Sequence, residues 1–182
     1  GLIAFPKVLT ESNTTHKSVP MLMSDATACN YDSIYHQKGI ITAFKEAGFR
    51  TAFFSNQRYN HSFIDFFGME ADTYDFIKED SLDSAYNPSD DELLALVAKE
   101  LSKGNQKQFI VLHTYGSHFN YRERYPSEDA FFLPDYPVEA EVKYRDNLVN
   151  AYDNTIRYTD GFLSRLIHML EEQHVDAAML YT

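Results

Sequence analysis

Residues Gln108–His118 read Gln-Phe-Ile-Val-Leu-His-Thr-Tyr-Gly-Ser-His, and this stretch decides the fold class. The run from Phe109 to Leu112 is continuously apolar, which is typical of strands covered on both faces of a parallel sheet. Gly116 then allows the backbone to bend tightly. Because ligands bind outside the carboxyl ends of the strands in open α/β sheets, the stretch predicts a buried strand followed by a functional loop.

Apolar runs and helical patterns alternate along the rest of the chain, which predicts a layered α/β/α fold with a largely parallel sheet. The predicted strands are residues 49–55, 74–77, 108–113 and 177–181. The predicted helices begin near Thr15 and cover 39–47, 60–67, 89–102 and 141–172, with loops at 78–88 and 115–137. We expect the last helix to bury a stripe at helical spacing, formed by Leu148, Tyr152, Ile156, Thr159, Leu163, Leu166 and Leu170.

Length, composition and net charge indicate how many domains the chain forms and which partners it can bind. With 182 residues, of which 44% are apolar, we expect residues 1–182 to belong to one domain with a substantial core. The net charge of −11 argues against a nucleic-acid partner, because such proteins need basic surfaces. The sequence has no apolar run long enough to cross a bilayer. Both ends read as cuts within a larger α/β fold, so we expect a truncated domain.

Hydroxyl groups gather in Glu11–Pro20, where the first helix begins. A helix start offers free N–H groups and the positive end of its dipole to an anion, so a hydroxyl here is placed to attack phosphorus. Thr15 is the candidate nucleophile, and the alternative is a helix cap. A threonine hydroxyl needs a metal or a base to become reactive, so this hypothesis requires a metal partner. Pro20 is expected in or near the first turn, where a proline is tolerated.

Polar side chains follow two of the predicted strands. His113 and His118 flank the turn after strand 108–113, and Asn56 and Gln57 follow strand 49–55. These groups suit a phosphate or an amine-bearing headgroup at the carboxyl edge of a sheet. The alternatives are a core histidine at 113, a loop histidine bonded to backbone at 118, and ordinary turn residues at 56 and 57.

Three segments resemble the phosphoethanolamine transferases of the alkaline phosphatase superfamily. Residues 12–24, SNTTHKSVPMLMS, resemble the nucleophile helix of that family. Residues 111–126, VLHTYGSHFNYRERYP, resemble its histidine segment, and residues 150–160, NAYDNTIRYTD, resemble its long helix. The motifs occur in the expected order and cover essentially the whole chain.

This resemblance implies a role for each candidate residue. The phosphorylated threonine of the family falls on Thr15, which would also ligate zinc. His118 falls on a histidine that contacts the phosphoryl group or a second zinc ion, and His113 on a further site histidine. Asn56 and Gln57 fall in the segment that contacts the headgroup.

The resemblance also implies a function for the parent protein. It would transfer phosphoethanolamine from phosphatidylethanolamine to lipid A or another envelope glycan, through a phosphothreonine intermediate and with Zn²⁺. It would be anchored in the bacterial inner membrane, with the catalytic domain in the periplasm. The remaining zinc ligands of the family would precede Gly1 or follow Thr182. We therefore expect this fragment to be inactive, to bind zinc poorly and to self-associate through exposed strand edges.

Three other functions stay open. A phosphoglycerol transferase of the same superfamily also uses a threonine nucleophile. A sulfatase uses a modified cysteine or serine followed two residues later by proline and then by arginine, a pattern that Cys29-Asn30-Tyr31 and Ser18-Val19-Pro20-Met21 both lack. A non-catalytic binding module that kept the fold is the third.

Overall fold

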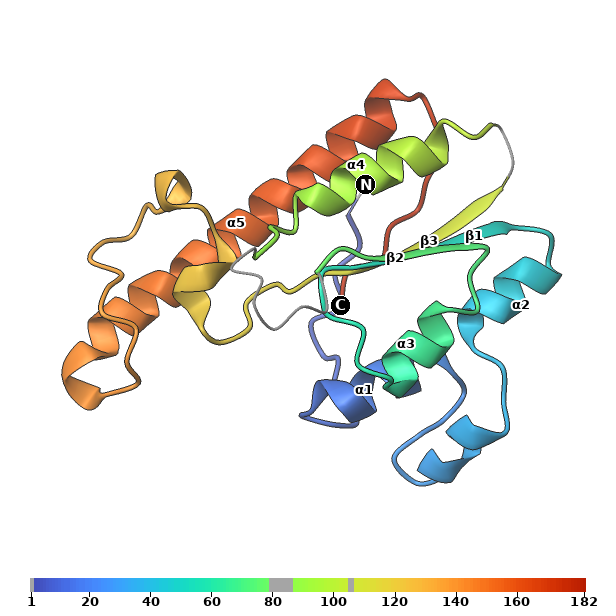
Figure 1. The fold of residues 1–182 in the computed structure, drawn as a ribbon, viewed down its shortest axis with the longest axis horizontal. Coiled ribbons are helices and arrows are strands. Elements are labelled where there is room, and N and C mark those ends of the chain that lie inside the picture. The colour runs from blue at the N-terminus through green and yellow to red at the C-terminus, as the bar shows by residue number, and fades with distance from the viewer. Residues whose placement is uncertain (1, 79–86, 105–106) are drawn as a thin grey trace. The chain divides into compact units, whose positions relative to one another are not determined.

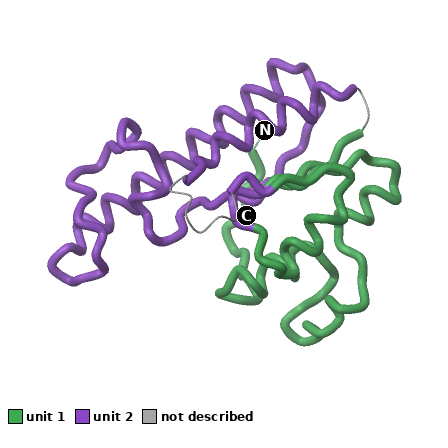
Figure 2. The backbone as a smooth tube through the Cα atoms, viewed as in Figure 1, with its two compact units in different colours: residues 1–54, 59–75, 105–111 green, residues 55–58, 76–104, 112–182 purple. Residues whose placement is uncertain are grey.

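The computed structural model describes residues 2–78, 87–104 and 107–182. The chain divides into two compact units, which Figure 2 colours separately. Unit 1 comprises residues 1–54, 59–75 and 105–111, and unit 2 comprises residues 55–58, 76–104 and 112–182. Both units include parts of the strands, so the chain passes between them several times.

Helices and strands alternate along the chain, as Figure 1 shows. The strands are β1 (Arg50–Ser55), β2 (Thr73–Phe76) and β3 (Gln108–His113). The α-helices are α1 (Thr15–Met23), α2 (Ile40–Glu46), α3 (Phe63–Gly68), α4 (Glu92–Leu101) and α5 (Arg145–Glu172). Short 3-10 helices are η1 (Tyr31–Tyr35), η2 (Tyr121–Arg124), η3 (Ser127–Asp129) and η4 (Val142–Tyr144). These elements confirm the α/β class, and the loop predicted at 78–88 lies mostly outside the described residues.

The described strands pair in the order β2-β1-β3. At one end of the β1–β3 pair the N–H of Arg50 donates to Lys107, and at the other the N–H of Asn56 donates to His113, both at 2.9 Å. Because both strands advance by six residues in the same direction between these bonds, the pair is parallel. β1 is the buried strand, whereas β3 is only half-buried. The prediction of a fully buried strand at 109–112 was therefore wrong, because the central strand of the described sheet is β1.

Helix α1 begins at Thr15, as predicted, but Pro20 lies in its second turn. A proline there has no N–H for the carbonyl four residues earlier, which is that of His16. The hydroxyl of Tyr31, at the start of η1, donates to this carbonyl at 3.1 Å. The expectation that Pro20 is tolerated through its place in the first turn was wrong, and a side chain from η1 supplies the missing donor instead.

Helix α5 buries a face that differs from the predicted stripe. Its buried residues are Ala151, Asn154, Thr155, Tyr158, Phe162 and Leu166, so Leu166 alone belongs to both sets. Tyr152 and Ile156, both predicted to be buried, are exposed. The polar side chains at 154 and 155 are buried because each has hydrogen-bond partners in the loop that precedes the helix.

The loop at 115–137 is held against α5 by a buried polar network. Asn154 Oδ1 accepts the backbone N–H groups of Phe131 and Phe132, both at 2.9 Å. The hydroxyl of Tyr125 donates to Asp135 at 2.9 Å, and Arg122 forms an ion pair of 2.9 Å with the same carboxylate. These contacts explain why so long a segment takes a defined path along the helix.

Residues 177–181, predicted as a core strand, are not a strand. Leu180 is 78% exposed, and the residues that follow α5 pair with none of β1, β2 and β3. An apolar run becomes a strand only where a neighbouring strand offers N–H and C=O groups. Among the described residues, no helix has both the length and the apolar character needed to cross a membrane.

Candidate active site

The carboxylate of Asp90 joins the two polar segments that follow β1 and β3. It accepts the side-chain amide of Asn56 at 2.8 Å. It also accepts the backbone N–H groups of Tyr115 and Gly116, at 2.8 and 2.9 Å. The structure therefore brings Asn56 and the Tyr115–His118 loop together within unit 2, as expected from their places after the strands. Sequence reasoning missed Asp90, for which the available signal was an acid in the turn before α4.

The side chain of Asn56 is fully buried, with 1% of its surface exposed. Its Nδ2 atom donates to Pro88 O at 3.1 Å as well as to Asp90, so the orientation of the amide is fixed by two acceptors. The Oδ1 atom is buried and accepts no hydrogen bond from any residue that the structure describes. The site thus contains a buried acceptor whose partner is not part of the described chain.

His113 and Gln57 both form hydrogen bonds with Ser55, the last residue of β1. The Oγ atom of Ser55 lies 3.1 Å from His113 Nδ1 and accepts the backbone N–H of Gln57 at 3.1 Å. Ser55 is itself buried. These contacts orient the imidazole of His113, and they agree with the reading of this residue as a satisfied histidine at a strand end.

His118 is exposed, and its two ring nitrogens have different surroundings. Its Nδ1 atom bonds the carbonyl oxygen of Phe119. A carbonyl can only accept, so Nδ1 carries the proton and Nε2 has a free lone pair in the neutral ring. The ring also packs edge-to-face on Tyr115, with centroids 5.3 Å apart. His118 therefore presents Nε2 as a proton acceptor or a ligand atom.

Thr15 belongs to unit 1, whereas Asn56, Gln57, His113 and His118 belong to unit 2. It is the first residue of α1, and Thr14 is the cap residue whose carbonyl accepts the N–H groups of Lys17 and Ser18. The half-buried Thr15 side chain makes no hydrogen bond to any described residue. Its hydroxyl is thus not used as a helix cap, which was the alternative reading.

Within residues 2–78, 87–104 and 107–182, no three His, Cys, Asp or Glu side chains lie close enough together to hold a metal ion. A zinc site needs three or four protein ligands. The described side chains therefore do not fit a zinc ion by themselves.

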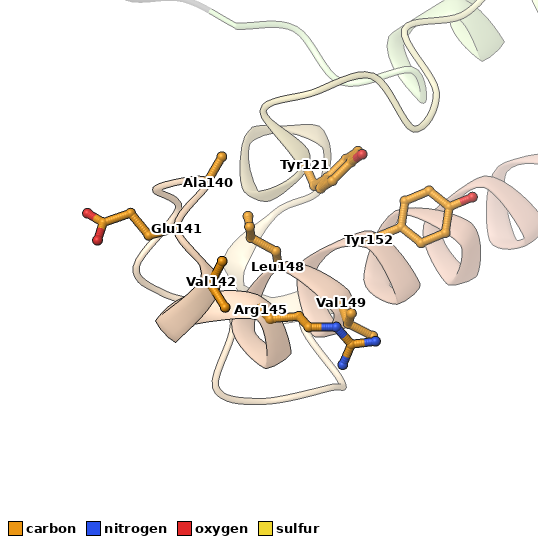
Figure 3. A pocket seen from close by; sticks show the side chains of 8 residues that line it. All are labelled: Tyr121, Ala140, Glu141, Val142, Arg145, Leu148, Val149 and Tyr152. Carbon is orange, nitrogen blue, oxygen red and sulfur yellow. The ribbon is translucent and has the colours of Figure 1, made fainter.

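An apolar groove of about 480 Å³ lies elsewhere in unit 2, between η2, η4 and the start of α5 (Figure 3). Its lining residues are Tyr121, Ala140, Glu141, Val142, Arg145, Leu148, Val149 and Tyr152. None of the candidate residues lines this groove. The candidate site is thus defined by hydrogen-bonded polar groups and not by this hollow.

A parallel sheet with polar side chains fixed after two of its strands defines an α/β protein, and the strand ends are where such proteins bind their ligands. The whole chain, residues 1–182, matches the Sulfatase family, so the protein belongs to that family. This agrees with the alkaline phosphatase-like fold that the family resemblance of the three segments implied.

Relatives in Escherichia coli K12 carry transferase names. The chain is 28% identical to "Putative transferase YhbX" over 97% of its own length and 30% of that protein. It is 35% identical to "Kdo(2)-lipid A phosphoethanolamine 7''-transferase" over 46% of its length and 15% of that enzyme. The chain therefore spans less than a third of each of these relatives.

Solved structures show the same fold. The soluble domain of lipooligosaccharide phosphoethanolamine transferase A from Neisseria meningitidis has a TM-score of 0.77 and 27% identity, over 92% of this chain and 51% of that one. The C-terminal periplasmic domain of EptC from E. coli, solved as a complex with Zn, has a TM-score of 0.78. Its identity is 22%, over 90% of this chain and 47% of that one, so it supports the fold alone.

Proposed function

We propose that the complete protein transfers phosphoethanolamine from phosphatidylethanolamine to lipid A or another envelope glycan. The observation that carries the proposal is the Thr15 hydroxyl, which stands at the first residue of α1 and makes no hydrogen bond within the described chain. The transferase names of the relatives support the same reaction. Residues 1–182 then form part of the catalytic domain, and this part alone is inactive.

The reaction has two displacement steps at phosphorus. In the first, the Thr15 oxygen attacks the phosphorus of the donor, the bond to the diacylglycerol oxygen breaks, and diacylglycerol leaves with the threonine proton. In the second, the oxygen of an acceptor hydroxyl attacks the phosphorus of the phosphothreonine, the bond between phosphorus and the Thr15 oxygen breaks, and the acceptor's proton passes to Thr15. The free N–H groups of the first turn of α1 stabilise negative charge on the phosphoryl oxygens.

Asn56 and His118 contribute the polar contacts of unit 2. The buried Oδ1 atom of Asn56 is an acceptor without a donor among the described residues, which suits the ammonium group of ethanolamine. The Nε2 atom of His118 accepts a proton, and the imidazolium that results donates to a phosphoryl oxygen. Gln57 lines the same headgroup region, and His113 holds its place through Ser55.

Zinc belongs to the proposal as a cofactor of the complete protein. Its support is the resemblance of residues 12–24 and 111–126 to the transferase family, which assigns zinc contacts to Thr15 and His118. The remaining ligands would come from sequence outside residues 1–182. We also propose an inner-membrane protein with a periplasmic catalytic domain, because the EptC domain of Campylobacter jejuni, which is 29% identical over 90% of this chain, is described as a C-terminal periplasmic domain.

Substitution of Thr15 tests the proposed function directly. The Thr15→Ala variant of the complete protein should fail to add phosphoethanolamine to lipid A, as followed by mass spectrometry of lipid A. Thr14→Ala is the matched control, because it removes the neighbouring hydroxyl and should retain most of the transfer. Modified lipid A in cells that contain only Thr15→Ala would refute Thr15 as the nucleophile. Purified wild-type protein that transfers phosphoethanolamine equally well with and without zinc would refute the cofactor.

A further inference from the structure

Basic side chains converge on Tyr115 in unit 2. The Nζ atom of Lys78 lies 4.7 Å from the centroid of the Tyr115 ring, and Cζ of Arg124 lies 3.9 Å from it. Arg58 is close enough for its charge to act on Lys78. Arg58, Lys78 and Arg124, called the basic cluster here, thus gather in a chain whose net charge is −11.

Bringing these charges together costs free energy. Burial lowers the pKa of Lys78, and the positive charges of Arg124 and Arg58 lower it further. Among the described residues, the carboxylate of Glu123 acts in the opposite direction, and it is exposed and pairs with Arg124 at 2.9 Å. An anion that bound here would offset the repulsion between the cations.

The cluster keeps donors for such an anion. Within the described part of the chain, Lys78 donates one N–H, to Asn87 at 2.8 Å, and an ammonium group has three. Arg124 donates from Nε to Asn120 and from Nη2 to Glu123, so its Nη1 group has no hydrogen-bond partner among the described residues. The side chain of Arg124 is only 6% exposed, which holds its charge in one place.

The cluster also lies beside the loop that carries His118. Tyr115 contacts both cations through its ring face, its ring packs against that of His118, and its backbone N–H is fixed by Asp90. An anion bound by Lys78 and Arg124 would therefore sit next to the side chain to which the proposed function assigns a phosphoryl contact.

We propose that the basic cluster is a phosphate-binding subsite, which takes a phosphate group of one of the two lipid substrates. This inference rests on the proposed function for the identity of the substrates, while the binding of phosphate itself does not. The phosphate belongs either to the donor headgroup or to a phosphorylated sugar of the acceptor. Both present negatively charged phosphoryl oxygens to Lys78 and Arg124.

Calorimetric titration of the complete protein distinguishes the two sources. Phosphoethanolamine represents the donor headgroup, and glucosamine 1-phosphate represents a phosphorylated sugar. We expect Lys78→Gln and Arg124→Gln each to weaken binding of one of these ligands about tenfold or more, with Lys78→Arg retaining most of the affinity. Lys143→Gln is the control, because it removes a lysine that is 61% exposed outside the cluster.

The binding titration tests the phosphate subsite, whereas the Thr15→Ala experiment tests the nucleophile. Weaker binding of phosphoethanolamine alone assigns the donor, and weaker binding of the sugar phosphate alone assigns the acceptor. If Arg124→Gln does not fold, Lys78→Gln decides. Wild-type protein that binds neither ligand, or variants that bind both within twofold of the wild type, would overturn the subsite and indicate that the cluster is neutralised by the chain. Thr15→Ala should abolish transfer and leave phosphate binding intact, so either hypothesis can fail alone.

Discussion

The Oδ1 atom of Asp90 lies 2.8 Å from the Nδ2 atom of Asn56 and accepts its hydrogen bond. The same carboxylate holds the backbone of Tyr115 and Gly116. A single buried acid thus fixes the amide after β1 and the turn after β3, two segments that are 59 residues apart along the sequence as counted from Asn56 to Tyr115. The positions of both segments therefore depend on one side chain.

Replacing Asp90 should reduce both stability and activity, because its carboxylate accepts hydrogen bonds from two segments of the site. Asp90→Asn puts an amide donor where the carboxylate accepted N–H groups, so we expect a loss of about 1–3 kcal/mol in the free energy of unfolding. In the complete protein, the proposed transferase activity should fall about 10- to 100-fold, because catalysis is sensitive to small displacements of positioning groups. Asp91→Asn is the control, since Asp91 pairs with Arg165 at a more exposed position. Equal effects of the two substitutions would contradict this role.

Asn154 should be the most sensitive polar position of α5. Asn154→Ala leaves the N–H groups of Phe131 and Phe132 without their acceptor. Because unpaired N–H groups in a partly buried position are costly, we expect a loss of about 1–3 kcal/mol in the free energy of unfolding. Urea denaturation followed by circular dichroism measures this loss. Asn150→Ala, which removes one exposed bond to Pro134, should cost less. A cost at 150 that matches the cost at 154 would count against the network.

The hydroxyl of Tyr31 should support α1. Tyr31→Phe leaves the carbonyl of His16 without a donor from η1, and a loss of about 0.5–1.5 kcal/mol in unfolding free energy is expected. Tyr35→Phe is the control, because the Tyr35 side chain is 62% exposed. If Pro20→Ala is introduced first, the helix regains its own N–H donor and the cost of Tyr31→Phe should shrink. An undiminished cost in that background would show that the hydroxyl acts elsewhere.

Stability should fall at alkaline pH because of buried tyrosines. Burial raises the pKa of Tyr125 to about 12 and that of Tyr158 to about 12. The unfolded chain loses these protons near its ordinary pKa of 10.0, before the folded protein does. The stabilisation is therefore complete below pH 10 and declines as the pH rises toward 12. Tyr125→Phe should flatten the decline in urea midpoints across this range, whereas Tyr181→Phe should not; equal slopes would exclude Tyr125 as the source.

The elements were predictable where local pattern determines them. Gly48 and Gly104, which both adopt positive φ, mark helix ends in the sequence, and the limits of β3 follow from its apolar run. The clustering of Asn56 with the Tyr115–His118 loop followed from the rule that ligand sites lie at strand ends. It needed no knowledge of side-chain contacts.

The errors come from contacts that are distant in sequence. Asp90 is an ordinary turn residue until the chain places it beside Gly116, so its neighbours alone carry no signal of that role. The buried face of α5 includes Asn154 and Thr155, which an apolar stripe cannot predict because their burial depends on partners in the preceding loop. Residues 177–181 have a strand-like composition, but composition does not supply a neighbouring strand.

The bond between Tyr31 and the His16 carbonyl also links the evolution of two positions. A proline at 20 is tolerated only while another residue supplies the donor that it lacks. Homologues that lack the tyrosine at 31 should tend to lack the proline at 20 as well. Where position 20 holds a residue with a backbone N–H, position 31 no longer needs a hydroxyl and should vary freely. Positions 20 and 31 should therefore covary among homologues, although they lie on different helices.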